Sequence, residues 1–109
     1  MMKGPVNTKD VQPVKMSDGI FRRTLVYDDA VMICHITLDR GSEIPLHDHE
    51  AHQIGHMIRG RLRFITETGE FTVCEGDSYV FDSYEKHGAV CLEPTEVIEV
   101  FSPSREEYK

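Results

Sequence analysis

Six histidines occur in this chain of 109 residues, and four of them cluster within ten residues of one another. His47 and His49 are two residues apart, so in an extended segment their imidazoles point to the same face. Pro45 favours an extended segment, because the residue before a proline is biased away from helix. Gln53 follows after a short gap, and His87 follows a later turn. Since imidazole suits Zn, Ni, Cu, Fe and Mn, the pattern indicates a transition-metal site without identifying the metal.

Three nearby side chains are rivals for such a site. Glu50 offers a carboxylate, but in an extended segment it faces away from His47 and His49. His56 shares its face with two isoleucines, which favours a structural role. His52 lies next to Gln53, where it would line the mouth of a site.

A second group of chemically capable residues lies near the C-terminus. The run 97–101 is apolar on both faces, as in a strand buried on both sides, and Glu99 interrupts it. A buried carboxyl would have a raised pKa that suits proton transfer, whereas on an edge strand Glu99 would meet water. Arg105 offers a planar fork that suits a carboxylate, or forms a surface ion pair in a charged tail. Both alternatives stay open for both residues.

The elements that must position these residues read as short strands. Turn signals separate them at intervals of about 8–12 residues, which indicates a sandwich or a barrel in one all-β domain. Residues 1–17 form a polar lead-in with at most one edge strand, residues 18–103 the β-barrel domain, and residues 104–109 a charged tail. Within 31–38 one face is shared by Met32, Cys34, Ile36 and Leu38. Cys34 and Cys74 are predicted to be small core residues. The expected strands are 20–27, 31–38, 53–59 (closed by Gly60), 62–66, 71–73, 79–81, 88–92 and 96–102.

Composition excludes several classes of partner. Nineteen acidic and twelve basic residues give a net charge of −7, which argues against binding to nucleic acid or to anionic membranes. No apolar run is long enough to span a bilayer, and the first residues lack the pattern of a signal peptide. Three cysteines without a CxxC pair fit a reducing compartment, so a cytoplasmic location is expected.

Two spacings carry a family resemblance. Gly41-x5-His47-x-His49-x3-Gln53-x6-Gly60 resembles the first motif of the cupins, G-x5-H-x-H-x3,4-E-x6-G, with Gln where Glu is usual. The second motif is eroded: Gly76 and His87 are in place, but other residues occupy its Pro, Gly and Asn positions. The resemblance implies a double-stranded β-helix (jelly-roll barrel). It also implies one divalent transition metal (Ni, Zn, Mn, Fe or Cu), bound by His47, His49, Gln53 and His87.

The C-terminal run 99–108 narrows the resemblance. Its sequence, EVFSPSREEY, is similar to the D-x-F-S-P-x-R-x-D/E-F/Y ending of small cupins of the KdgF pectin-degradation group, with Glu for Asp. That group converts 4,5-unsaturated monouronates to linear keto forms. The resemblance implies that Glu99 and Arg105 are catalytic, and that Phe101 and Arg105 bind the substrate.

The glutamine adds a chemical preference. Three imidazoles and an amide cancel none of the metal charge, so the ion keeps its Lewis acidity toward an anionic ligand. This favours isomerisation or hydration over oxygen chemistry. Together with the resemblance, it predicts a metal-dependent cupin that converts small unsaturated uronates or related sugar acids to their linear keto forms. Two alternatives remain: a cupin dioxygenase acting on a small enol, thiol or catechol-like compound, and a non-enzymatic cupin that binds a small anion. By resemblance to cupins of this size, a homodimer is expected.

Overall fold

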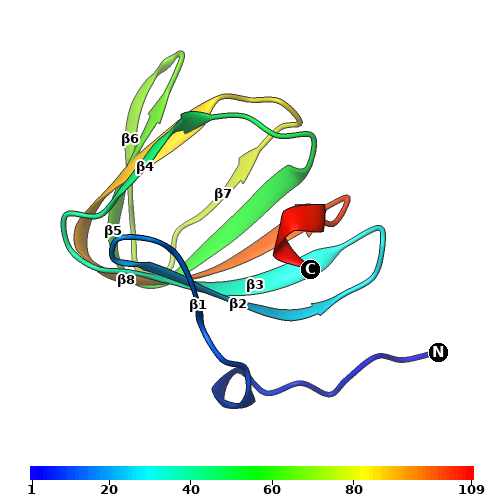
Figure 1. Ribbon diagram of the computed structural model, residues 1–109. Coiled ribbons are helices and arrows are strands. Elements are labelled where there is room, and N and C mark those ends of the chain that lie inside the picture. The colour runs from blue at the N-terminus through cyan, green and yellow to red at the C-terminus, as the bar shows by residue number, and fades with distance from the viewer.

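The computed structural model describes all 109 residues. It is an all-β fold, as the sequence predicted, and it also contains two single-turn 3-10 helices (Figure 1). None of its helical turns has the length or hydropathy needed to cross a bilayer. The elements are η1 (Thr8–Asp10), β1 (Val14–Ser17), β2 (Ile20–Tyr27), β3 (Met32–Leu38), β4 (Glu43–His47), β5 (His52–Thr66), β6 (Gly69–Cys74), β7 (Ser78–Phe81), β8 (His87–Ser102) and η2 (Glu106–Tyr108).

The two longest strands, β5 and β8, pair antiparallel with each other through the centre of the sheet (Figure 1). The first half of β5 and the second half of β8 lie in one sheet with β3, β2, β1 and β7. The other halves carry β4 and β6. Because both long strands have pairing partners along both halves, all eight strands join in one sheet that curves around a single core.

The expected breaks in these two strands do not occur. The sequence predicted that one strand ends at Gly60 and that another break falls between residues 92 and 96, yet β5 and β8 run through both points. Gly60 instead marks a bend, with φ +97° and an irregular register around it. A Cβ there would lie 2.4 Å from the carbonyl oxygen of Pro94 and 2.4 Å from Oγ1 of Thr95. The glycine thus lets β5 bend from one half of the sheet into the other while it stays paired with β8.

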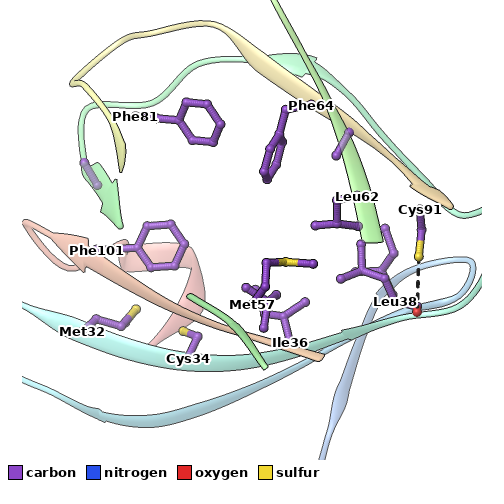
Figure 2. Close-up of a cluster of buried hydrophobic side chains, with 14 residues drawn as sticks. Met32, Cys34, Ile36, Leu38, Met57, Leu62, Phe64, Phe81, Cys91 and Phe101 are labelled. Atoms are coloured by element: carbon purple, nitrogen blue, oxygen red, sulfur yellow. Dashed lines mark hydrogen bonds between the residues drawn. The ribbon is translucent and has the colours of Figure 1, made fainter. Parts of the chain in front are cut away.

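The core follows the alternation of the strands. The apolar residues of β3 are buried on one face, as predicted, and meet side chains from β5 and β8 inside the barrel (Figure 2). Cys34 is buried among them, whereas the prediction for Cys74 was wrong. Cys74 ends β6, which pairs only with β5 and forms an edge, so its side chain is exposed. Cys91 is buried instead, and its thiol donates to the main-chain oxygen of Leu38.

The bend at Gly60 generates a stability prediction. Gly60→Ala combines a strained positive φ with a clash against the backbone of β8, whereas Gly76→Ala has a similar φ (+87°) and no atom within 4 Å of the added carbon. We expect Gly76→Ala to lose about 1–2 kcal/mol and Gly60→Ala at least about 2 kcal/mol more. Urea unfolding of both variants measures the difference. Equal losses of stability would show that β8 moves to accommodate the added methyl group, and that the nearness of β8 does not restrict residue 60 to glycine.

Candidate metal centre

Three of the predicted ligands converge at one end of the barrel. His47 ends β4 and pairs in register with His87, which begins β8, while His49 lies in the loop after β4. The nitrogen atoms that these three imidazoles can offer to a metal lie within 4.8 Å of one another. The main-chain N–H of Tyr84 donates to the oxygen of His49 at 2.8 Å and so ties the loop of His49 to the loop that precedes His87. Strand pairing and loop contacts therefore hold the cluster together.

Each imidazole is oriented by a main-chain hydrogen bond. The Nδ1 atoms of His47, His49 and His87 each lie 2.8–2.9 Å from a carbonyl oxygen two residues away. A carbonyl only accepts, so each Nδ1 carries the hydrogen and each Nε2 keeps a free lone pair. All three rings consequently present a metal-binding nitrogen to the same space.

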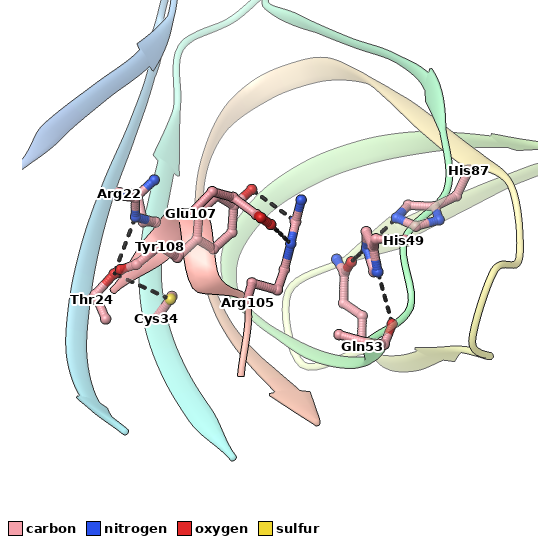
Figure 3. Close-up of polar contacts among 10 residues, drawn as sticks. Arg22, Thr24, Cys34, His49, Gln53, His87, Arg105, Glu107 and Tyr108 are labelled. Atoms are coloured by element: carbon pink, nitrogen blue, oxygen red, sulfur yellow. Dashed lines mark hydrogen bonds and ion pairs between the residues drawn. The ribbon is translucent and has the colours of Figure 1, made fainter. Parts of the chain in front are cut away.

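Gln53 completes the cluster from β5. Its Oε1 lies 3.0 Å from Nε2 of His49 and 3.2 Å from Nε2 of His87 (Figure 3). Its own amide nitrogen donates to Oε2 of Glu99 at 2.9 Å. The amide oxygen therefore faces nitrogen lone pairs, with no hydrogen to share between them. Additional protons do not resolve this conflict at neutral pH, because burial lowers the pKa of His49 and lowers that of His87 to about 4. A cation in the middle does resolve it, so the donor set fits a divalent transition metal.

Glu99 faces the barrel interior from β8. The residue is 6% exposed. Of the two alternatives that the sequence left open, a buried strand and an exposed edge strand, the structure therefore shows the buried one. Burial raises the pKa of its carboxyl to about 7, although hydrogen bonds from Gln53 and Tyr79 oppose the rise. The Tyr79 hydroxyl donates to Oε1 at 2.9 Å, and Gln53 donates to Oε2. A carboxyl in this state exchanges a proton near neutral pH.

Arg105 lies just beyond β8, on the side of the cavity formed by the C-terminal tail (Figure 3). Its guanidinium carbon is 5.3 Å from the ring centroid of Phe101 and 4.2 Å from that of Tyr108. Nε donates to Glu107 at 2.7 Å and Nη1 to the Tyr108 hydroxyl at 2.8 Å, which leaves Nη2 without a partner in the chain. The tail is itself held in place, since the Thr24 hydroxyl donates to the main-chain oxygen of Tyr108. Arg105 is thus a fixed, partly engaged cation.

One cavity of about 260 Å³ connects these groups. The predicted site residues on its wall are His47, Gln53, His87, Glu99, Phe101 and Arg105. His49 reaches them through its contact with Gln53. Most of the remaining lining is aliphatic or aromatic, and Arg105 is the only Lys or Arg among it. The cavity therefore combines a cluster of lone-pair donors, a protonatable carboxyl and a single positive charge.

The rival side chains lie elsewhere. His52 and His56 are exposed; the first pairs with Asp82 at 3.2 Å and the second contacts the Ser78 hydroxyl at 2.8 Å. Glu50 is exposed as well. None of the three belongs to the metal-capable cluster. His52 and His56 are outward residues of β5, which alternate with inward ones such as Gln53, and Glu50 lies in the loop before β5.

Sequence analysis missed two aromatic residues of β7. The Phe81 ring stacks on the His87 imidazole, with centroids 4.2 Å apart and planes 7° apart, and Tyr79 binds Glu99. The alternation of residues 79–81 already places both rings on one face. Gly55 was the other available signal, because a glycine inside a strand often marks a close approach by a neighbouring group.

Comparison with known proteins identifies relatives of this arrangement. A family model described as a cupin domain matches residues 34–101. The pectin degradation protein KdgF of Dickeya dadantii (strain 3937) is 30% identical over 96 residues, covering 86% of this chain and 87% of that protein. The structure of KdgF from Halomonas sp. superposes with a TM-score of 0.92 at 28% identity, covering 99% and 100% of the two chains. An RmlC-like cupin from Shewanella frigidimarina NCIMB 400 also gives 0.92, at 24% identity over 99% and 97%, and supports the fold alone.

The burial of the imidazoles generates a pH prediction for metal binding. A divalent ion binds only neutral imidazole, so affinity must fall as the pH falls. Because burial lowers the pKa of His49 and brings that of His87 to about 4, we expect the loss to develop below the ordinary histidine pKa of about 6.5 and to continue to about pH 4. Titration of the metal-free protein with Zn²⁺ or Ni²⁺ by calorimetry at each pH measures it.

Two alanine variants provide the matched comparison. His49→Ala should weaken binding at every pH, whereas exposed His56→Ala should leave the profile unchanged. An affinity that stays flat down to pH 4, or a loss in His56→Ala equal to that in His49→Ala, would contradict the assignment of the ligands.

Proposed function

The chain belongs to the cupin family and is a relative of KdgF, and on that basis we propose that it is a metal-dependent isomerase of small unsaturated uronates. The observation that carries the proposal is the cavity itself, where the histidine–glutamine cluster, Glu99 and Arg105 line one space of about 260 Å³. The relative from Dickeya dadantii is named a pectin degradation protein, and the resemblance of the C-terminal run 99–108 implies a group that acts on unsaturated monouronates.

Conversion of an unsaturated monouronate to its linear keto form requires the transfer of a proton. An unsaturated monouronate is a cyclic hemiacetal in which the ring oxygen is bonded to an alkene carbon that bears the carboxylate. Ring opening breaks the bond between the ring oxygen and the anomeric carbon, which leaves an aldehyde and an enol. Tautomerisation then moves one proton from the enol oxygen to the neighbouring alkene carbon and gives the ketone. The overall change is an isomerisation, so it needs acid and base groups but no second substrate.

Arg105 suits the carboxylate of this substrate. It is the only Lys or Arg in the cavity wall, and its guanidinium is held over Phe101 by the tail. The unpartnered Nη2 can donate to a carboxylate oxygen, and a charge-assisted bond of this kind is about twice as strong as a neutral one. Phe101 fixes the height of the guanidinium and supplies an apolar wall.

Glu99 suits the proton transfer. Each of its oxygens accepts one hydrogen bond from the chain and keeps a second lone pair for a substrate proton. With its pKa near 7, the carboxyl can give and take a proton at the enol oxygen and at the alkene carbon. When held by His47, His49, Gln53 and His87, a divalent ion supplies uncancelled positive charge that polarises the oxygens of the bound sugar.

This proposal predicts how a substitution at Glu99 separates chemistry from metal binding. In the metal-loaded protein, Glu99→Gln should lower turnover of unsaturated galacturonate- and mannuronate-type monouronates by about 100-fold or more, because the proton carrier is lost. The amide oxygen can still accept from Gln53, so metal content should change little. Loss of alkene absorbance measures turnover, and metal analysis of the same samples measures occupancy.

The controls separate this function from the alternatives. A chelated sample sets the spontaneous rate, and oxygen uptake with enol and thiol substrates tests for a dioxygenase. No acceleration above the spontaneous rate by protein that demonstrably contains metal would overturn the uronate proposal. Equal losses of turnover and metal in Glu99→Gln would overturn the role assigned to its carboxyl.

A further inference from the structure

We propose that Tyr79 is a positioning residue for the metal centre: its hydroxyl holds the Glu99 carboxylate, which in turn fixes the orientation of the Gln53 amide. Gly55 provides the space that the tyrosine needs. The inference deepens the proposed function and rests on metal binding at that site, but not on the identity of the substrate.

A glutamine ligand poses a problem that a glutamate does not. The two ends of an amide have nearly the same shape but opposite hydrogen-bonding character, and a half-turn about the last side-chain bond exchanges them. With Oε1 inward, Gln53 offers a lone pair beside the imidazoles of His49 and His87. With the nitrogen inward, it would offer hydrogens and no ligand atom. The site therefore needs a group that favours one orientation.

Glu99 is that group. Its Oε2 accepts from the Gln53 amide nitrogen at 2.9 Å, and a carboxylate oxygen at this point would repel the amide oxygen of the reversed orientation. This preference lasts only while Oε2 faces Gln53. A carboxylate on a flexible glutamate side chain has to be held there by a further contact.

Tyr79 supplies the contact. Its hydroxyl donates to Oε1, the other oxygen of the same carboxylate, at 2.9 Å. Burial raises the pKa of this hydroxyl, so it stays a donor at neutral pH. The ring cannot shift easily, since it packs edge-on against Phe64 with centroids 4.6 Å apart and lies 5.5 Å from Phe81. The two ends of the carboxylate are thus engaged by different donors.

Strand register explains how Tyr79 reaches Glu99. Gly55 on β5 pairs with Tyr79 on β7 and with Glu99 on β8, so the three residues form one row across the sheet. The tyrosine side chain crosses the space above Gly55. A Cβ at residue 55 would lie 2.1 Å from Cζ of Tyr79 and 2.3 Å from its hydroxyl oxygen. Any other residue at 55 would displace the ring from the carboxylate.

Tyr79→Phe tests the proposal, because it removes the hydroxyl and keeps the packed ring. The metal-free protein is titrated with Co²⁺ while the visible absorption of the bound ion is recorded. The absorption reports both the affinity and the ligand geometry. We expect about 10- to 100-fold weaker binding and a changed spectrum, with a melting temperature showing that the variant is folded. Tyr108→Phe is the matched control, because it removes a hydroxyl that contacts Arg105 and not Glu99.

A second substitution tests the explanation itself. In a Gln53→Glu background the ligand has two equivalent oxygens, and a proton shared with Glu99 takes the place of the amide hydrogen. Orientation then no longer matters, and Tyr79→Phe should change Co²⁺ affinity less than about threefold. Unchanged affinity and spectrum in Tyr79→Phe alone would overturn the proposal. An equal loss in both backgrounds would overturn the amide-orientation mechanism. Wild-type Co²⁺ binding is measured first, so the two proposals are tested separately. An absence of uronate turnover would not affect the Co²⁺ comparison, and unchanged Co²⁺ binding in Tyr79→Phe would not affect the turnover assay.

Discussion

The candidate metal centre is built on acceptor atoms that face one another without a hydrogen between them, an arrangement that a bound cation would stabilise. Three imidazoles are turned by main-chain carbonyls so that their Nε2 lone pairs share one space, and the Gln53 oxygen meets two of them. Buried acceptors facing one another without a hydrogen are unfavourable, and a divalent ion converts the repulsion into coordination. The pairing of β4 with β8, the loop contact to His49 and the inward face of β5 all serve to assemble this cluster.

The same barrel separates the metal-capable cluster from the groups that would act on a substrate. Glu99 is on β8 and touches the cluster only through Gln53, while Arg105 reaches the cavity from the tail beyond β8. One strand thus carries His87 at its beginning and Glu99 near its end, and the bend opposite Gly60 lets both ends of β8 line the cavity. Since Glu99 and Arg105 are held by different elements, the geometry of one can be changed without rebuilding the other.

Sequence reasoning was strongest where local rules act alone. Strand alternation predicted the buried face of β3, and the spacing of His47 and His49 predicted that their rings would converge. It failed where long-range pairing overrides a local signal. Gly60 was predicted to end a strand, but β5 continues past it because it pairs with β8 on both sides of the bend. Cys74 lay in an apolar run, yet exposure depends on which strands form an edge. The link between Tyr79 and Glu99 joins three strands, so no local pattern contains it.

Anomalous diffraction from crystals of the metal-loaded protein, measured at the absorption edge of the bound metal, tests the central claim most directly. The account predicts one peak within about 2.0–2.3 Å of the Nε2 atoms of His47, His49 and His87 and of Oε1 of Gln53, with the Gln53 amide nitrogen still on Glu99. A peak bound through Nδ1 atoms, at the exposed histidines of β5, or facing the amide nitrogen of Gln53 would contradict it.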